Sequence, residues 1–574
     1  MKTLNLHSDF IKFKALKKAL KNIDEIAPNQ MLEGEMKDCL VILTAIEKGD
    51  TLDSAKELVK SIEDHAKQVQ AKNVVLYPYA HLSSNLASPS LALDILNETA
   101  KNLKGFKVLQ APFGHYKEFE IKVKGHPLSE LSREIKSIAN EESIAALTQK
   151  EREDLWRKME KIKMQALRGN NNLKSNVELG RELDLYIVSD VVGPGLPLFT
   201  PKGASIRREL ERFTIDEEIK RGYEHTSTPI MAKSDLYKLS GHWYHYKNDM
   251  FTLDVHGEDY ALRPMTCPFQ FVLYKRKPRT YKDLPKRYAE VASLFRKEQS
   301  GELRGLTRMR QFTLADAHIL CTDEQLENEF KGVVDLINYI MKTLGIEVWY
   351  RFSKWDPENK RGKYIDDPKS WESTEKSMKK ILDKLKVNYN EAKDEAAFYG
   401  PKLDLQFKDV YGKEDTLITV QIDFATAKNF NLTYIDKDGK ESHPRIIHRS
   451  SIGATERMMS YVLEKTQGNL PLWLSPVQVR VLSMNESLED YANKIKQKLI
   501  EQGIRAEVDN TNETIGKKAR SAITEKVFYL ATVGEKEAKS NKVAVRSRDS
   551  DKITDMKLDD FVKKLKEEIS SRKL

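Results

Sequence analysis

Cysteine is scarce in this chain of 574 residues, which has only Cys39, Cys267 and Cys321. Three cysteines far apart in the sequence argue against a disulfide framework and favour a reducing compartment. No run of about 18 apolar residues is present, so we expect no membrane-spanning helix. The first ten residues, MKTLNLHSDF, lack the apolar core of a signal peptide. We therefore expect a cytoplasmic protein without a membrane segment.

Glycine-rich phosphate loops are also missing. The chain has no GxxxxGK[ST] sequence and no GxGxxG that follows a strand pattern, so neither a P-loop nor a Rossmann cradle is predicted. A nucleotide site in this chain would have to use charged side chains instead.

The composition fits a multidomain globular protein. At 40% hydrophobic and 32% charged residues, the chain can form ordinary cores, and its length predicts three or four domains. A formal charge of +9 permits a polyanionic partner but does not require one, because a lysine-rich surface gives the same charge.

Residues 1–140 alternate between helical and strand patterns and predict a compact α/β or α+β domain. A charged helical stretch, Ser129–Leu167, and the asparagine-rich run 168–176 follow. We predict a helical connector and linker at 141–178, with a flexible joint at 168–176. In the first domain the expected helices are Phe10–Ile26 and Leu52–Gln70, and the expected strands are Cys39–Ile46, Val74–Tyr79 and Phe119–Val123.

A long domain, 179–470, begins with a helix signal. Thr200 is an expected N-cap followed by Pro201, and the helix should bury one apolar face and end at Gly222. Strands are expected to about 320, a helical insertion to about 397, strands again to Phe424, and a helix from near Gly453.

The last segment, 471–574, predicts a small α/β domain around a mixed sheet. The expected strands are Val477–Leu482, Arg505–Val508, Phe528–Val533 and Lys542–Arg546, and the expected helices are Ser487–Gln502, Thr514–Lys526 and Lys557–Lys573.

The segment Ser293–His318 carries the strongest functional signal. We predict a strand with Arg296 and Glu298, a loop rich in arginine and glycine, and a second strand that ends in Asp316 and His318. An arginine and an acid two residues apart on a strand point to one face, where they could hold a phosphate and an amine. An exposed hairpin can carry the same pair without a function.

This segment resembles motif 2 of the class II aminoacyl-tRNA synthetases in their threonine-specific form. The helix Gly203–Gly222 with the following EHTSTPI resembles motif 1, and IGATERMM, 452–459, resembles motif 3. The resemblance covers about 180–574 and implies a catalytic core on an antiparallel sheet, a homodimer formed through 180–230, and a C-terminal anticodon-binding domain. It further implies ATP with Mg²⁺, threonine and tRNA(Thr) as substrates and partners.

The resemblance also implies roles for individual residues. Arg296 would hold the α-phosphate of ATP, Glu298 the adenine amino group and Arg308 the γ-phosphate, while Arg457 stacks on adenine beside Gly453. Carboxylate adenylation needs in-line placement and cations that absorb charge on pyrophosphate, so no histidine or cysteine nucleophile is required.

Three segments, LRPMTCP, ADAHIL and IIHRSSIG, resemble the places where this family supplies zinc ligands, which would be Cys267, His318 and His448. Their spacing alone would not indicate a metal. One cysteine and two histidines leave an open position on Zn²⁺, which the family uses for the amino group and hydroxyl of threonine, with Asp316 accepting from the hydroxyl. Valine lacks that hydroxyl and would leave these groups unpaired.

Further matches and two departures surround this site. The block AAFYGPKLDLQF places Tyr399 and Lys402 near the substrate, and TVQIDF places Gln421 there. After Cys267-Pro268 many bacterial members continue Gly-His, whereas this chain has Phe269-Gln270. Leu314 stands where bacterial members have glutamine.

The terminal domains carry matches of their own. In the C-terminal domain Asn512, Glu513 and Arg520 are candidate contacts to the anticodon, while lysines would add phosphate contacts without specificity.

The N-terminal domain resembles the archaeal editing domain, which is related in fold to D-aminoacyl-tRNA deacylases, through YPYAHLSSN and APFGHYKEFEIKVKGHPLSE. His81, Tyr116, Lys117 and Glu130 match its editing positions, and His115 stands where the family often has tryptophan. Serine differs from threonine by one methyl group, which a pocket distinguishes by only about 1–3 kcal/mol. A second site that hydrolyses Ser-tRNA(Thr) is therefore expected, and a domain that only holds tRNA is the alternative.

Two other functions stay open at this point. A synthetase-like binding or regulatory protein would have lost motif charges or metal ligands, which this chain retains. A class II enzyme for proline or serine would share parts of the architecture, but Cys267, His318 and His448 argue against it.

Overall fold

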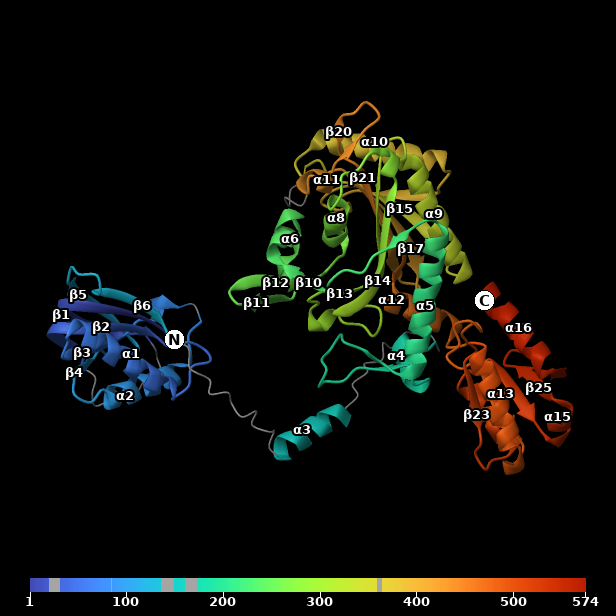
Figure 1. Cartoon of the computed structure of the whole chain (residues 1–574), viewed down its shortest axis with the longest axis horizontal. Coiled ribbons are helices and arrows are strands. Elements are labelled where there is room, and N and C mark those ends of the chain that lie inside the picture. Colours follow the sequence, from blue (N-terminus) through green and yellow to red (C-terminus); the bar gives the residue numbers. More distant parts are fainter. Residues whose placement is uncertain (20–30, 84, 136–148, 161–172, 359–363, 574) are drawn as a thin grey trace. The chain divides into compact units, whose positions relative to one another are not determined.

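The computed structural model describes two compact units, Met1–Glu151 and Arg152–Leu574, which are treated separately (Figure 1). No described helix is both long and apolar enough to cross a membrane. The residues described are 1–19, 31–83, 85–135, 149–160, 173–358 and 364–573.

The first unit is built on a six-stranded sheet in the order β4-β3-β2-β1-β5, with β6 also paired to β1. Leu40 and Ile42 of β2 pack with the helices α1 and α2, whereas Cys39, Val41 and Leu43 belong to the core on the other face. This alternation is the two-residue period of a strand buried on both faces. The elements are β1 (Lys2–Lys18), β2 (Glu33–Ala45), α1 (Ser54–Val69), β3 (Asn73–Pro78), α2 (Pro89–Asn102), β4 (Lys107–Gln110), β5 (His115–Val123) and β6 (Glu130–Glu134).

One expectation for this region is wrong. The predicted helix Phe10–Ile26 is the second half of β1 as far as Lys18, and residues 20–26 lie outside the described part. Ile11 and Phe13 are buried while Lys12 and Lys14 are exposed, which is a strand period that was misread as helical. The other predicted strands and the helix Leu52–Gln70 are confirmed.

The charged stretch Ser129–Leu167 is helical only in part. It begins with strand β6, which pairs with the start of β1, and contains the helix α3 (Gln149–Glu160). Residues 168–172 of the predicted flexible joint lie outside the described part of the chain, and its last residue, Asn176, begins the helix α4 (Asn176–Glu182). Backbone pairing with a neighbouring strand outweighs helix propensity at β6.

The second unit contains an eight-stranded sheet in the order β16-β15-β17-β18-β21-β14-β13-β9. Figure 1 labels β13, β14, β15, β17 and β21 of this sheet. Its pairings are antiparallel except β9 with β13 and β15 with β16, so the predicted antiparallel core is confirmed. The strands are β9 (Glu224–His225), β13 (Lys286–Phe295), β14 (Gln311–Cys321), β15 (Trp349–Ser353), β16 (Tyr389–Ala392), β17 (Lys402–Lys408), β18 (Glu414–Asp423) and β21 (Arg445–Ala454).

The region predicted as a helical insertion is mixed. It contains the helices α9 (Leu326–Thr343) and α10 (Pro368–Lys384), but β15 and β16 lie between and after them and extend one edge of the sheet. The central strand β21 was not predicted, because its run of buried residues has no alternating pattern.

The helix α5 (Pro201–Lys220) confirms the predicted cap and apolar face. The Thr200 hydroxyl accepts from the backbone N–H of Gly203 at 3.3 Å, and Ile206, Leu210 and Phe213 are buried. Near its end Glu218 forms a buried ion pair with Arg449 of β21 at 2.5 Å. The helix is thereby attached to the centre of the sheet.

The C-terminal part has a five-stranded sheet in the order β23-β22-β24-β25-β26, with the first three strands parallel and the last two antiparallel. The predicted mixed sheet is confirmed, while α15 (Glu535–Ser540) and β26 (Ile553–Lys557) were not predicted. The remaining elements are β22 (Val479–Ser483), α13 (Glu489–Glu501), β23 (Ala506–Asp509), α14 (Ile515–Thr524), β24 (Tyr529–Val533), β25 (Lys542–Ser547) and α16 (Leu558–Ser571).

Candidate active site

A pocket of about 580 Å³ lies against the eight-stranded sheet. It is lined by residues of β14, β18 and β21 and of the loop between β13 and β14. Most of the residues predicted for nucleotide, amino acid and metal binding line this one pocket, namely Cys267, Arg296, Glu298, Arg308, Asp316, His318, Tyr399, Gln421, His448, Gly453 and Arg457.

One row of directly opposite residues crosses the sheet at this pocket. Lys402 lies opposite Gln421, Gln421 opposite His448, and His448 opposite His318. Opposite residues in an antiparallel sheet point to the same face. The register therefore brings together residues that are far apart in the sequence.

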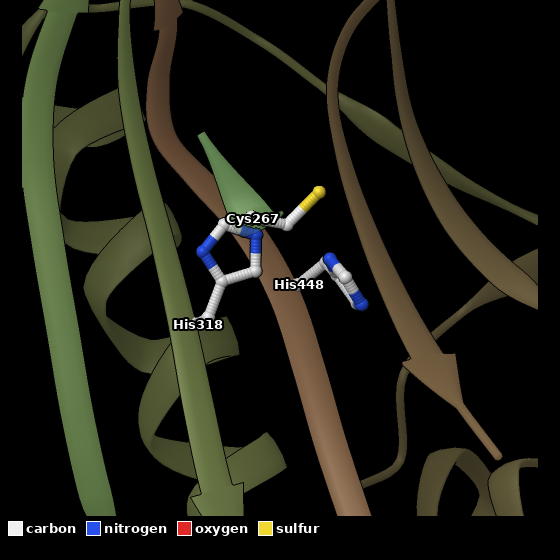
Figure 2. A group of neighbouring side chains, drawn as sticks. All are labelled: Cys267, His318 and His448. Carbon is white, nitrogen blue, oxygen red and sulfur yellow. The ribbon is translucent and has the colours of Figure 1, made fainter. Parts of the chain in front are cut away.

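Two of these residues belong to a candidate metal centre (Figure 2). Ligand atoms of Cys267, His318 and His448 all lie within 4.8 Å of one another, and all three side chains are buried. Cys267 opens the helix α8 (Cys267–Lys275), whereas the histidines come from β14 and β21. A thiol and two imidazoles form a donor set suited to Zn²⁺.

The two imidazoles are oriented by different neighbours. His448 Nε2 lies 2.9 Å from Asp423 Oδ2, and His318 Nδ1 lies 2.6 Å from Gln270 Oε1. Burial disfavours a charged Asp423, but hydrogen bonds from His448 and Thr426 outweigh it and lower its pKa. Since an ionised carboxylate only accepts, His448 carries its hydrogen on Nε2 and keeps the lone pair of Nδ1 for a metal.

The protonation states of His318 and Cys267 are compatible with binding of a metal cation. Burial, and then the neighbouring His448, lower the pKa of His318 well below its ordinary value, so the ring is neutral, as a ligand must be. Burial raises the pKa of the Cys267 thiol. A metal ion would reverse this effect, because a coordinating thiol is deprotonated.

Asp316 lies on β14 two residues before His318 and faces the same pocket. Its carboxylate accepts a hydrogen bond from the hydroxyl of Thr266. Burial raises its pKa, and the contact with Thr266 partly offsets that effect. A buried carboxylate beside the metal ligands is suited to bind a hydroxyl group of a small ligand.

Arg296 and Glu298 lie in the loop after β13 and not on the strand, so the predicted strand is too long by three residues. The Arg296 guanidinium lies over the Phe312 ring at 5.1 Å and is accessible through the pocket. Arg308 donates to Glu298 at 2.8 Å and to Glu302 at 3.2 Å. This arginine-rich loop presents several cations to one side of the pocket.

Arg457 and Gly453 also line the pocket. Arg457 donates to the carbonyls of Thr307 at 3.0 Å and Thr416 at 3.3 Å, which fix the plane of its guanidinium at the start of α12 (Thr455–Thr466). Gly453 has φ +73°, and a Cβ there would lie 2.6 Å from the Leu417 carbonyl oxygen. Only glycine fits at that position.

The remaining predicted substrate residues differ in position. Tyr399 donates to Gln421 through its hydroxyl, and both line the pocket. Lys402 shares their sheet face but forms an ion pair with buried Asp404 at 3.0 Å and does not line the pocket. Leu314, one of the departures, does line it.

Sequence reasoning missed Asp423 and Thr266 and treated Gln270 only as a departure. Asp423 lies two residues after Gln421 on a strand, so its presence on the same face could have been predicted. The partnership of Gln270 with His318 depends on how α8 packs on the sheet, and nothing in the local sequence indicates it.

A second group of predicted residues lies in the first unit. Lys117 on β5 donates to the carbonyls of Pro112 at 2.9 Å and His115 at 3.3 Å and lies over the Tyr77 ring at 5.0 Å. Burial lowers the pKa of Lys117 to about 8. Perturbation of this size is typical of functional lysines as well as of buried ones.

The neighbours of Lys117 are connected through aromatic rings. Tyr77 contacts Tyr79, and Tyr79 contacts His81 edge to face at 5.5 Å. Tyr116 is exposed next to Lys117.

Glu130 lies elsewhere on the same sheet. It is opposite Leu6, whereas Lys117 is opposite Ala15, a separation of about 30 Å along β1 at the usual rise per residue. The register therefore does not bring Glu130 to Lys117.

The predicted anticodon contacts are on the surface of the C-terminal part. Asn512 and Glu513 precede α14, and Arg520 lies on it; all three are exposed. Glu513 is paired with Lys517 at 2.5 Å. Their exposure permits contact with a large ligand.

Comparison with known proteins identifies the parts of the chain. Residues 1–135 match the model of the Archaea-specific editing domain of threonyl-tRNA synthetase, 246–466 the class II core domain of synthetases for G, H, P, S and T, and 478–568 the anticodon-binding domain. The RNA binding domain of threonyl-tRNA synthetase from Cryptosporidium parvum is 34% identical, with a TM-score of 0.66 over 98% of that chain and 69% of this one. The chain belongs to the threonyl-tRNA synthetase family.

Curated relatives support this family. The threonine–tRNA ligase of Clostridium botulinum is 56% identical over 400 residues, which are 69% of this chain and 62% of that protein. The threonine–tRNA ligase of a Geobacillus strain is 45% identical over 395 residues, 68% of this chain and 61% of that protein. The chain therefore spans less than two thirds of these relatives. Membership in a threonyl-tRNA synthetase family removes the alternative of a proline- or serine-specific family.

Proposed function

We propose that this protein ligates threonine to tRNA(Thr) in two steps. Threonine and ATP first form threonyl-adenylate and pyrophosphate, and the threonyl group is then transferred to tRNA(Thr). The observation that carries the proposal is the shared pocket, in which a Cys₁His₂ cluster stands on one side and Arg296, Arg308 and Arg457 on the other. A metal site for an amino acid beside a cationic site for a triphosphate fits this reaction.

The arginines supply the electrostatic part of the first step. The carboxylate of threonine attacks the α-phosphorus while the bond to pyrophosphate breaks, and negative charge collects on the leaving group. Arg296 would hold the α-phosphate, Arg308 the γ-phosphate, and Arg457 would stack on adenine, with Mg²⁺ accompanying the nucleotide. The Arg308–Glu298 pair would open, which costs little because exposed pairs contribute about 0–1 kcal/mol.

Cys267, His318 and His448 would hold Zn²⁺. When bound, Zn²⁺ would supply a Lewis-acidic position for the amino group and hydroxyl of threonine. Asp316 would accept from that hydroxyl, and Tyr399 with Gln421 would close the pocket around the substrate. Valine offers no hydroxyl to these groups, so it should be rejected more strongly than its shape alone would allow.

The chain divides, in this proposal, into an editing domain at 1–140, a connector at 141–178, a catalytic domain at 179–470 and an anticodon-binding domain at 471–574. Asn512, Glu513 and Arg520 are the proposed base contacts of the last. The first would hydrolyse Ser-tRNA(Thr), with Lys117 near the ester and His81 and Tyr116 placing the tRNA end. Glu130 is also predicted to take part in editing, although the register of the sheet does not bring it to Lys117.

A homodimer through 180–230 completes the proposal. This region exposes apolar side chains at Val191, Val192, Leu198, Ile219 and Ile230, each 42–56% accessible. Exposed apolar side chains mark an interface when they form a contiguous patch, which is what the proposed dimer requires of this segment.

Sedimentation velocity tests the dimer. The protein is expected at twice the 66.1 kDa chain mass, and Ile219→Asp is expected to shift it toward monomer because burying a charge at an interface is unfavourable. Ile435→Asp, at an exposed site outside the segment, should leave the mass unchanged. A fully active monomer at assay concentration would contradict the proposal.

Exchange of labelled pyrophosphate into ATP tests the first step. Threonine should stimulate it, whereas valine and proline should not. Absence of threonine-stimulated exchange would favour the remaining alternative, a relative that binds but does not catalyse.

A further inference from the structure

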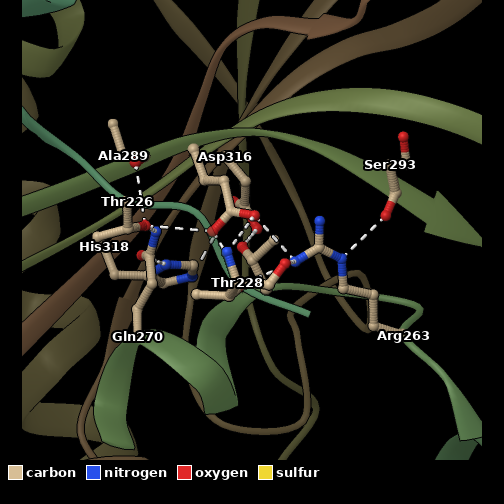
Figure 3. Close-up of polar contacts among 10 residues, drawn as sticks. Thr226, Thr228, Arg263, Gln270, Ala289, Ser293, Asp316 and His318 are labelled. Atoms are coloured by element: carbon tan, nitrogen blue, oxygen red, sulfur yellow. Dashed lines mark hydrogen bonds and ion pairs between the residues drawn. The ribbon is translucent and has the colours of Figure 1, made fainter. Parts of the chain in front are cut away.

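A buried chain of hydrogen bonds leads from the candidate metal centre to the segment that follows helix α5 (Figure 3). His318 Nδ1 is 2.6 Å from Gln270 Oε1, and Gln270 Nε2 is 3.0 Å from the Thr226 hydroxyl. The Thr226 hydroxyl lies 3.2 Å from Glu290 Oε2 and 3.2 Å from the Ala289 carbonyl oxygen. Gln270 is fully buried, so water does not replace these partners.

The far end of the chain fixes the direction of every hydrogen bond. Glu290 is paired with buried Arg263 at 2.9 Å, so it accepts and does not donate. A carbonyl oxygen also only accepts. The Thr226 hydroxyl has one hydrogen, which it donates either to the Glu290 carboxylate or to the Ala289 carbonyl. Thr226 must then accept from the nitrogen of the Gln270 amide.

This direction has a consequence for the metal ligand. With its nitrogen toward Thr226, Gln270 presents its oxygen to His318, and an oxygen without a hydrogen can only accept from Nδ1–H. A neutral imidazole with hydrogen on Nδ1 has its lone pair on Nε2. The unligated His318 is thereby held in one of its two tautomers.

We propose that Gln270 is a positioning residue of the metal centre, which holds His318 in the Nδ1–H tautomer and is itself oriented by Thr226 and Glu290. The inference rests on the proposed function only for the identity of the metal. It gives a role to the residue at which this chain departs from the Gly-His sequence of many bacterial relatives. It also links metal retention to Thr226, which lies within the segment 180–230 proposed for the dimer.

Zn²⁺ affinity of the full-length protein, measured by competition with a chromogenic chelator, tests the role of Gln270. Gln270→Leu keeps the approximate shape but removes the acceptor, so the dissociation constant is expected to rise about 10–100-fold. Gln270→Glu keeps an acceptor for Nδ1–H and should stay within about threefold of wild type. Equal losses in both variants, or an unchanged affinity in folded Gln270→Leu, would overturn the proposal.

Substitutions at Thr226 and Thr228 provide a matched pair that tests the hydrogen bonds beyond Gln270. The hydroxyls of Thr226 and Thr228 lie 3.2 and 2.9 Å from Glu290 Oε2, but of the two only Thr226 is hydrogen-bonded to Gln270. Thr226→Val should weaken Zn²⁺ binding several-fold, and Thr228→Val should not. Equal effects of the two substitutions would show that these threonines act only through packing. That result would overturn the proposed role of Thr226 in orienting Gln270.

The tautomer itself can be observed without metal. Labelling histidine with ¹⁵N in the metal-free wild-type protein should show His318 with hydrogen on Nδ1, assigned by comparison with His318→Gln. Hydrogen on Nε2 would overturn the inference even if Gln270→Leu failed to fold. Failure of the proposed function has a different signature, since it would remove Zn²⁺ binding or threonine-dependent exchange from the wild-type protein.

Discussion

Replacing His318 with alanine is expected to remove both the metal and the activation of threonine. Two of the three ligands cannot hold Zn²⁺ in the open tetrahedral site that a Cys₁His₂ set provides. Sites that recognise polar groups of a substrate discriminate by about 10⁴–10⁵ when those contacts are lost. We therefore expect threonine-dependent exchange to fall by at least about 1,000-fold, measured beside the zinc content of the purified protein.

A histidine that does not line the pocket provides the control for this change. His256 is exposed in the turn between β11 (Thr252–Val255) and β12 (Glu258–Leu262), with φ 55°, a conformation that asparagine tolerates. His256→Asn should keep full zinc content and exchange. Full zinc occupancy in His318→Ala would show that the ligand assignment is wrong.

Replacing Lys117 with methionine is expected to separate editing from charging. Methionine keeps the length of the side chain but not its hydrogen bonds to Pro112 and His115. Loss of one donor at a reacting centre typically costs about 10²–10³ in rate, so hydrolysis of Ser-tRNA(Thr) should fall by about 100-fold. Threonylation of tRNA(Thr) should stay within about twofold, because the catalytic pocket belongs to the other unit.

The matched control lies on the same strand. Lys122 is exposed and pairs with Asp9 at 3.1 Å, so Lys122→Met removes an equal charge without touching the Lys117 group. A variant without residues 1–140 should accumulate Ser-tRNA(Thr) as Lys117→Met does. If that variant cleared Ser-tRNA(Thr) at the normal rate, the domain would only hold tRNA.

The pH dependence of hydrolysis distinguishes two roles of Lys117. Burial lowers its pKa to about 8, so the charged form that donates hydrogen bonds declines as the pH rises through 8. An orienting lysine therefore predicts slower enzymatic hydrolysis above pH 8, after correction for spontaneous ester cleavage. A rate that increases through the same range would indicate a general base.

The parts of the fold that were predictable have local signals. The cap at Thr200 and the apolar face of α5 are encoded within one helix, so the sequence predicted them. The second half of β1 was misread because a helical period and a strand period overlap over a few residues. Strand β21 is buried on both faces and carries no period at all, so it was missed.

In the candidate site, too, the residues with a local sequence signal were predictable and the others were not. The arginines and the glutamate of motif 2 are close in sequence and were found together. His318 and His448 lie opposite each other because of the register between β14 and β21. The two histidines are 130 residues apart in the sequence, so their spacing does not indicate this contact. The resemblance to a known family supplied those ligands. The neighbours that orient them, Asp423 and Gln270, required the packed structure.

Threonine-dependent exchange of pyrophosphate into ATP is the most direct test of the central claim, that one pocket joins a metal site for the amino acid to arginines for the triphosphate. The zinc-loaded protein is predicted to exchange with threonine, more weakly with serine, and not with valine, although valine has the same shape. Removal of the metal should abolish exchange, and returning Zn²⁺ should restore it. Exchange that did not distinguish valine from threonine, or no exchange with threonine, would contradict the account.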